Sequence, residues 1–149
     1  MSGENSKPTP NEVYAKFVAA LIGWDGYLGF VEEFYAPDAT HELPFAPPGV
    51  PKVTAGKEQI LALMAAGAQM SPFRYDEVRN PVLRLADGGE TLIAEHEIVG
   101  HVEATGKTFA HPGVLFLSVR DGKITRFREY SDPLAAGEAL GDTPSYDLT

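Results

Sequence analysis

The stretch DGKITRFREYSDP, residues 121–133, decides how the rest of the chain is interpreted. Asp121-Gly122 is a hairpin turn signal, because glycine tolerates the positive φ that a tight turn requires. After the turn, side chains alternate between two faces, as in a strand with one buried side. Phe127 indicates that its own face is the inner one, and Glu129 shares that face. A carboxylate on the inner face of a sheet is costly unless it is paired or has a function.

The composition describes an ordinary globular chain without cysteine. Its 149 residues predict one domain over 10–140, with a flexible N-terminus at 1–9 and a tail at 141–149. The net charge of −9 argues against a nucleic-acid partner, because phosphate binding needs a basic patch. No apolar run approaches the ~20 residues of a membrane span, and no signal peptide is recognisable. We therefore expect a cytoplasmic protein with no membrane partner. The absence of cysteine excludes disulfides and thiolate ligands.

Sequence periodicity divides the chain into a helical half followed by a sheet half. Helices are expected over 10–22, 26–35 and 57–68, a short strand over 40–45, and a short helix from Asp132-Pro133. Longer strands are expected over 73–85, 90–104, 107–120 and 123–132. This order predicts an α+β fold, in which N-terminal helices cover one face of a curved antiparallel sheet.

Strand alternation places three of the four histidines on inner faces of the sheet. His41, His96 and His111 each alternate with apolar neighbours on the expected strands. Together with Glu129, they are expected to point into one apolar cavity. Histidine titrates near neutrality, and a nearby carboxylate would orient its tautomer and raise its pKa. Such a set can move a proton on a carbonyl, enol or imine substrate without a cofactor.

Each of these assignments has a structural alternative. An inward histidine is more often a core or pocket-lining residue than a catalyst, and Glu129 can be the partner of a structural ion pair. The histidines lie on different strands without the helical HxxxH spacing of metal ligands, so we predict no metal site. Glu95 and Glu97 flank His96 but alternate onto the opposite face, where a solvated or dimer-facing role is expected.

Short motifs follow one another along the chain at characteristic spacings. They are Phe17–Leu21, Tyr35–Thr40, Gly56–Glu58, Asp121–Ile124, Arg128–Tyr130 and Asp132-Pro133. Their order resembles that of the nuclear-transport-factor-2-like superfamily, in its SnoaL-like branch, over roughly residues 10–140. The resemblance implies a cystatin-like α+β cone, with a bent sheet around helices and a central pocket open at one end, in a homodimer. The superfamily includes binding proteins as well as enzymes, so the fold alone fixes no function.

The site of ketosteroid isomerase, a well-known member of the superfamily, can be compared position by position. That site needs a carboxylate base, with a tyrosine and a protonated aspartate as oxyanion donors. The tyrosine position falls on Phe17, the base position on Leu43 and the aspartate position on Leu115. All three residues are apolar, so the resemblance does not imply that isomerase's mechanism.

Two other enzyme groups of the superfamily share an acid at Glu129. Limonene-type epoxide hydrolases use an Asp–Arg–Asp arrangement, whose final acid falls on Glu129, whereas the arginine falls on His96 and the other aspartate on Ile98. The phenazine-biosynthesis A/B proteins have an acid/base glutamate that coincides with Glu129, and their histidine falls on Leu63. In both groups the acid carries over and its partners do not.

The sequence therefore predicts a cofactor-independent enzyme of cyclase, isomerase or dehydratase type, acting in secondary metabolism on a small apolar or aromatic metabolite. Glu129 and His96, with His41 or His111, would act as general acid and base. The predicted substrate-binding residues are Phe17, Trp24, Tyr35, Leu43, Leu63, Ile98, Leu115 and Phe127. Two alternatives stay open: epoxide opening of the limonene type, and a non-catalytic dimeric module that binds a small ligand.

Overall fold

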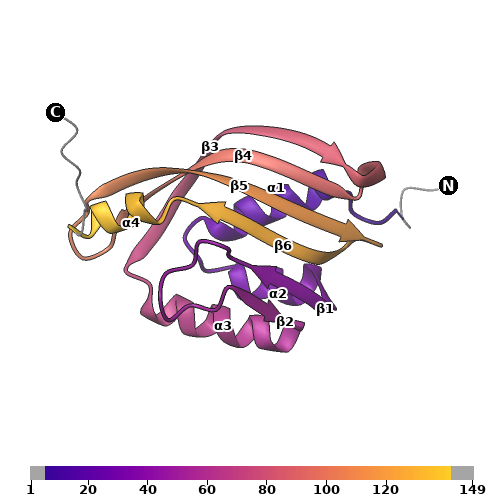
Figure 1. Ribbon diagram of the computed structural model, residues 1–149, viewed down its shortest axis with the longest axis horizontal. Coiled ribbons are helices and arrows are strands. Elements are labelled where there is room, and N and C mark those ends of the chain that lie inside the picture. Colours follow the sequence, from indigo (N-terminus) through magenta and orange to yellow (C-terminus); the bar gives the residue numbers. More distant parts are fainter. Residues whose placement is uncertain (1–5, 142–149) are drawn as a thin grey trace.

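The computed structural model describes residues 6–141, in which helices lie against a curved six-stranded sheet (Figure 1). The helices are α1 (Pro10–Leu21), α2 (Tyr27–Phe34), α3 (Lys57–Met70) and α4 (Pro133–Ala139). The strands are β1 (Tyr35–Glu42), β2 (Val53–Ala55), β3 (Phe73–Ala86), β4 (Thr91–Val102), β5 (Thr108–Arg120) and β6 (Lys123–Ser131). The predicted α+β class is confirmed. Part of the predicted N-terminus and almost all of the predicted tail lie outside the described residues.

The sheet is mixed, which corrects the prediction of a wholly antiparallel one. Its strand order is β2-β1-β6-β5-β4-β3, with a parallel pairing only between β1 and β6. Strand β1 begins at Tyr35 and ends at Glu42, whereas the sequence predicted a short strand over 40–45. The early part of β1 contains Pro37, a residue type that is rare inside sheets. It lies where the ladder to β6 is interrupted between Tyr35 and Thr40, so its missing N–H costs no ladder hydrogen bond.

Local sequence signals account for the ends of two central elements. Helix α1 begins with a capping box, because the Thr9 hydroxyl accepts a hydrogen bond from the Glu12 N–H and the Glu12 carboxylate accepts one from the Thr9 N–H. The hairpin between β5 and β6 has positive φ at both Asp121 (53°) and Gly122 (77°). That is the geometry of a type I′ turn, and it confirms the predicted hairpin. The register of this hairpin determines which side chains of β6 face the helices.

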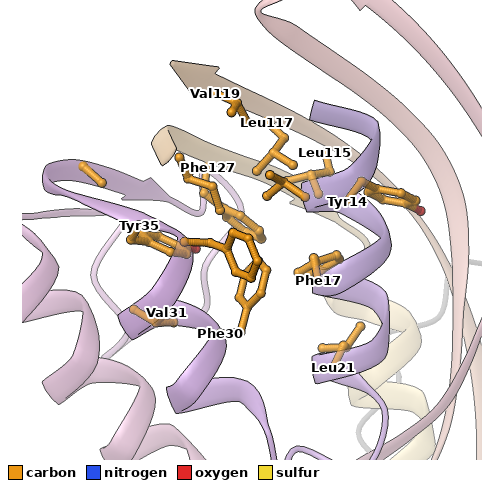
Figure 2. Close-up of a cluster of buried hydrophobic side chains, with 14 of the residues drawn as sticks. Tyr14, Phe17, Leu21, Phe30, Val31, Tyr35, Leu115, Leu117, Val119 and Phe127 are labelled. Carbon is orange, nitrogen blue, oxygen red and sulfur yellow. The ribbon is translucent and has the colours of Figure 1, made fainter. Parts of the chain in front are cut away.

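The core lies between the helices and the inner face of the sheet, and Figure 2 shows its central side chains. Phe17 of α1 is 1 % exposed, and its ring centre lies 5.4 Å from that of Phe127 on β6. Fully burying a large apolar side chain stabilises a fold by about 1.5–3 kcal/mol. The core therefore holds β6 firmly against α1. No helix within residues 6–141 is long and apolar enough to cross a membrane.

Candidate active site

A cavity of about 520 Å³ lies between the inner face of the sheet and the helices, next to α4. Its walls come from α1, the turn before α2, the loop after β1, helix α4 and the inner faces of the sheet. Most of the lining is apolar or aromatic. Among the described lining residues the carboxylates are Glu129 and Asp132, and there is no lysine or arginine. The cavity thus combines an apolar wall with uncompensated negative charge.

Glu129 reaches this cavity because of the alternation along β6. It lies two residues after the buried Phe127 and pairs across the sheet with Leu115 of β5, so its side chain faces the helices. The side chain is 16 % exposed. Its Oε2 atom is buried and has no hydrogen-bond partner among residues 6–141. A buried acceptor without a partner is costly, which indicates a role other than stability.

His96 lies beside this carboxylate and is held by a tyrosine of α1. The Tyr14 hydroxyl and His96 Nδ1 are 2.8 Å apart, and His96 Nε2 lies 3.9 Å from Glu129 Oε2. The histidine side chain is fully buried, and Nε2 has no hydrogen-bond partner among residues 6–141. When Tyr14 donates to Nδ1, the ring proton is on Nε2 and faces Glu129. When Tyr14 accepts from Nδ1, Nε2 is a free acceptor.

The other two inward histidines are neutral groups at the cavity wall. His41 Nδ1 lies 3.0 Å from the Tyr35 hydroxyl, and burial lowers the pKa of His41 to about 4 against the opposing charges of Glu129 and Glu42. Burial also lowers the pKa of His111, whose Nδ1 has no hydrogen-bond partner in the described part of the chain. Neither histidine supplies positive charge at neutral pH.

Tyrosines around the cavity are protonated hydrogen-bond donors. Burial, with a smaller contribution from the Glu129 charge, raises the pKa of both Tyr14 and Tyr75 to about 12. The pKa values of Tyr27 and Tyr35 are raised further by burial, and Glu129 adds to both shifts. These tyrosines come from α1, α2, β1 and β3. The Glu129 charge therefore raises the pKa of every tyrosine in this group.

The predicted site residues are divided between the cavity wall and the core. His41, His111 and Glu129 line the cavity, and His96 adjoins it through Glu129. Among the predicted substrate-binding residues, those that line the cavity are Phe17, Trp24, Leu43, Ile98 and Phe127. Tyr35 and Leu115 are fully buried core residues that do not line it, and Leu63 is a half-buried residue of α3 that packs on the core. The structure thus corrects the predicted lining at these three positions.

Several residues of the site were not among the predicted site residues. The contact of Tyr14 with His96 joins positions 82 residues apart, and no local pattern signals it. Tyr75 and Met64 line the cavity from β3 and α3. Asp132 was predicted only at the start of a helix. Its Oδ1 does accept a hydrogen bond from the Leu134 N–H, but Asp132 also lines the cavity and raises the pKa of His111 against the larger effect of burial.

Within residues 6–141, no group of three or more His, Asp or Glu side chains is arranged to hold a metal ion. The arrangement described above is instead one carboxylate next to one imidazole, surrounded by hydroxyl donors and aromatic rings.

The sequence profile of the SnoaL-like domain matches residues 15–127. This chain belongs to the SnoaL-like family. Two relatives of the SnoaL-like protein are uncharacterised. YesE from Bacillus subtilis is 30% identical over 130 residues, which cover 87% of this chain and 86% of YesE. A PhzA/B-like protein from Pseudomonas aeruginosa is 30% identical over 109 residues, which cover 73% of this chain and 75% of that protein.

Solved structures agree with the fold of the SnoaL-like protein. A proposed isomerase from Bacillus subtilis superposes with a TM-score of 0.78 at 29% identity, covering 90% of this chain and 94% of its own. A proposed polyketide cyclase from Pseudomonas putida has a TM-score of 0.71 at 21% identity, covering 89% of this chain and 98% of its own. At 21% identity the second likeness shows the fold alone. The predicted resemblance is confirmed.

Proposed function

We propose that this SnoaL-like protein is a cofactor-free enzyme of cyclase, isomerase or dehydratase type, in which Glu129 is the general base. One observation supports this above all. Glu129 Oε2 is buried in an apolar cavity without a hydrogen-bond partner among the described residues, 3.9 Å from an imidazole nitrogen that also has none there. A carboxylate oxygen without a hydrogen-bond partner in the protein is available to take a proton from a bound substrate.

The arrangement suits removal of a proton from carbon. Cyclisation, isomerisation and dehydration can each begin when a base takes the proton beside a carbonyl group. Negative charge then develops on the carbonyl oxygen, and protonated tyrosine hydroxyls such as Tyr75 can stabilise it by donating hydrogen bonds. The 3.9 Å between His96 and Glu129 is too long for a hydrogen bond. It leaves Glu129 free to contact the substrate, with the imidazole of His96 beside it.

One relative supports the same class of chemistry: the structural neighbour at 29% identity is described as a proposed isomerase. Epoxide opening has less support, since no arginine lines the described cavity to take the place of the arginine in the Asp–Arg–Asp arrangement. The predicted homodimer also stays a prediction, which sedimentation at micromolar concentration would test.

The proposed base can be tested without the natural substrate by using 5-nitrobenzisoxazole. A base removes the C3 proton of this neutral ring, the N–O bond breaks, and a coloured cyanophenolate forms. We expect the wild-type protein to accelerate the ring opening with saturation. Glu129→Gln should lower the rate by roughly 10²–10⁴-fold, because general base catalysis is worth about that much.

A matched control shows whether a change in rate comes from the cavity carboxylate or from the loss of any carboxylate. Glu97→Gln removes one carboxylate from the opposite face of β4, where Glu97 pairs with Arg79, and should leave the ring-opening rate unchanged. Far-UV circular dichroism checks that each variant is folded. Saturable binding of the probe with no acceleration over acetate buffer would favour the non-catalytic binding module. Equal rates for wild type and Glu129→Gln would refute the assignment of the base.

A further inference from the structure

From the charges around the cavity, we propose that its ligand is a small protonated amine with an aromatic or alicyclic body, whose ammonium group lies between Glu129 and His96. This names the substrate class for the proposed function and rests on the cavity being the functional site; the ammonium group would take Oε2 of Glu129 and leave Oε1 for the proton transfer. The inference comes from charge balance, from two buried polar atoms without partners, and from the aromatic wall.

The described lining of the cavity carries negative charge without a lysine or arginine to balance it. Glu129 and Asp132 line it, and no lysine or arginine does among the described residues. The two histidines of the wall add no positive charge at neutral pH, because burial lowers their pKa values. An anionic ligand would therefore meet carboxylates with no cation to offset them, at a cost that grows in a low dielectric. A cationic ligand would neutralise a charge that the protein leaves uncompensated.

Two polar atoms beside the cavity lack hydrogen-bond partners in the described part of the chain. Glu129 Oε2 and His96 Nε2 are both buried, have no partner within residues 6–141, and lie 3.9 Å apart. A nitrogen atom about 2.9 Å from both would satisfy them together, and the Glu129 side chain must turn to admit it, because neither atom is open to the cavity as it stands. An ammonium group has N–H donors for both atoms, and His96 Nε2 can accept one of them when it carries no proton. The Tyr14 hydroxyl permits that tautomer by accepting the Nδ1–H of His96.

Aromatic rings form one wall of the cavity. The ring centre of Trp24 lies 4.7 Å from that of Tyr27 and 5.5 Å from that of Tyr75, and all three rings line the cavity. Aromatic faces attract cations and also pack against the apolar body of a ligand. Phe17 and Phe127 extend the same surface toward Glu129. The wall thus suits a ring-bearing amine better than a hydrated polar ligand.

Three probes of one shape test the proposal: 2-aminoindane (a cation), 2-indanol (neutral) and indane-2-carboxylate (an anion). Trp24 is the single tryptophan of the chain and lines the cavity, so its fluorescence reports binding directly. At pH 7 we expect the amine to bind about 10-fold to 100-fold more tightly than the alcohol, as hydrogen bonds to charged groups allow. The carboxylate should bind more weakly than the alcohol.

The variants show which group is responsible for the preference. Glu129→Gln should bring the amine-to-alcohol ratio close to one while the alcohol binds as before. Glu97→Gln, on the outer face of β4, should leave the ratio at its wild-type value. Wild-type protein that binds the three probes equally, or that prefers the carboxylate, would overturn the proposal even if a variant failed to fold.

The outcome is independent of the ring-opening experiment, since 5-nitrobenzisoxazole is uncharged. Loss of the amine preference with Glu129-dependent ring opening intact would refute the substrate class and leave the proposed function standing. An amine preference that depends on Glu129, without any ring opening, would support the ligand class and refute the proposed base.

Discussion

A buried and a partly buried carboxylate on opposite faces of the same sheet differ in almost every respect. Glu42 of β1 is 8 % exposed and accepts hydrogen bonds from Arg126 through two nitrogens, from Arg128 and from the Thr40 hydroxyl. The Arg126 guanidinium, followed by Arg128 and Thr40, lowers the pKa of Glu42 to about 2 despite its burial. This carboxylate ties β1 to β6.

Glu129 lies on the inner face of β6, one residue after Arg128, and has none of these partners. Its Oε2 is buried without a hydrogen bond among residues 6–141, and its ionisable neighbour is a histidine nitrogen 3.9 Å away. A paired carboxylate can stabilise a fold, whereas an unpaired one lowers stability, which is why we propose a chemical role for Glu129. The comparison teaches that hydrogen-bond partners, more than burial, separate the structural acid from the one for which we propose a function.

The largest expected effect concerns whether His96 and Glu129 act as one unit. His96→Asn removes the imidazole and should lower the ring-opening rate toward that of Glu129→Gln, within the 10²–10⁴-fold range of acid/base catalysis. The double variant should then be little slower than Glu129→Gln alone, because groups that act together are not additive. Rates are measured with 5-nitrobenzisoxazole. Additive losses would mean that the two residues act separately.

Removing the negative charge of Glu42 should lower the stability of the fold and leave the ring-opening rate unchanged. Glu42→Gln leaves Arg126 and Arg128 without their anion and should lower the free energy of unfolding by about 2 kcal/mol. This is below the ~3–5 kcal/mol typical of a fully buried pair, because the Arg126 side chain is 51% exposed and water can solvate it. Urea unfolding monitored by circular dichroism measures the change. An unchanged midpoint would show that the network around Glu42 contributes nothing to stability.

Acid should destabilise the protein in two windows that belong to different residues. The pKa of His41 is lowered from 6.5 to about 4, so between these values the unfolded chain binds a proton that the folded chain does not. Stability therefore falls as pH drops from 6.5 to 4, by about 3 kcal/mol at most from this residue. The pKa of Glu42 is lowered from 4.5 to about 2, so its contribution is lost between those values.

Two variants separate these windows in urea unfolding at a series of pH values. His41→Phe should flatten the decrease between pH 6.5 and 4, leaving the smaller slope that His111 adds. Glu42→Gln should flatten the decrease below pH 4.5. A wild-type stability that stays constant from pH 7 to 4 would contradict the neutral, buried state assigned to His41.

The smallest expected effect concerns Tyr14, which positions His96. Tyr14→Phe keeps the ring and removes the hydroxyl that lies 2.8 Å from His96 Nδ1. A hydrogen bond of about 1 kcal/mol corresponds to about a fivefold change. We expect kcat for ring opening to fall by about that factor with KM unchanged. A change in unfolding free energy alone, with kcat intact, would mean that the hydroxyl serves only the fold.

The sequence was a good guide where structure follows from a local pattern. Alternation along β4, β5 and β6 correctly predicted that His96, His111 and Glu129 face inward, because each strand has one buried side. The capping box at Thr9 and the turn at Asp121 were equally local. These signals involve neighbours a few residues apart, whose geometry the backbone fixes.

Features that depend on distant contacts were not predictable in the same way. The parallel pairing of β1 with β6 joins segments more than 80 residues apart, and β2 has three residues, too few to show a period. The prediction of Leu63 rests on the position of a histidine in the phenazine-biosynthesis proteins, and Leu63 packs on the core, whereas Met64 beside it lines the cavity. Phe45, the last residue of the strand predicted over 40–45, is 56 % exposed because β1 ends at Glu42.

The central claim is that Glu129 is kept for chemistry at a cost in stability, and one variant tests both halves of it. For Glu129→Gln we measure the free energy of unfolding in urea at pH 7 and the ring-opening rate on the same sample. The account predicts a rate lower by roughly 10²–10⁴-fold together with a stability equal to that of the wild type or higher by about 1 kcal/mol, since a neutral amide is less costly to bury than an unpaired carboxylate. A variant that unfolds more easily and keeps its rate would make Glu129 a structural acid like Glu42 and would contradict the account.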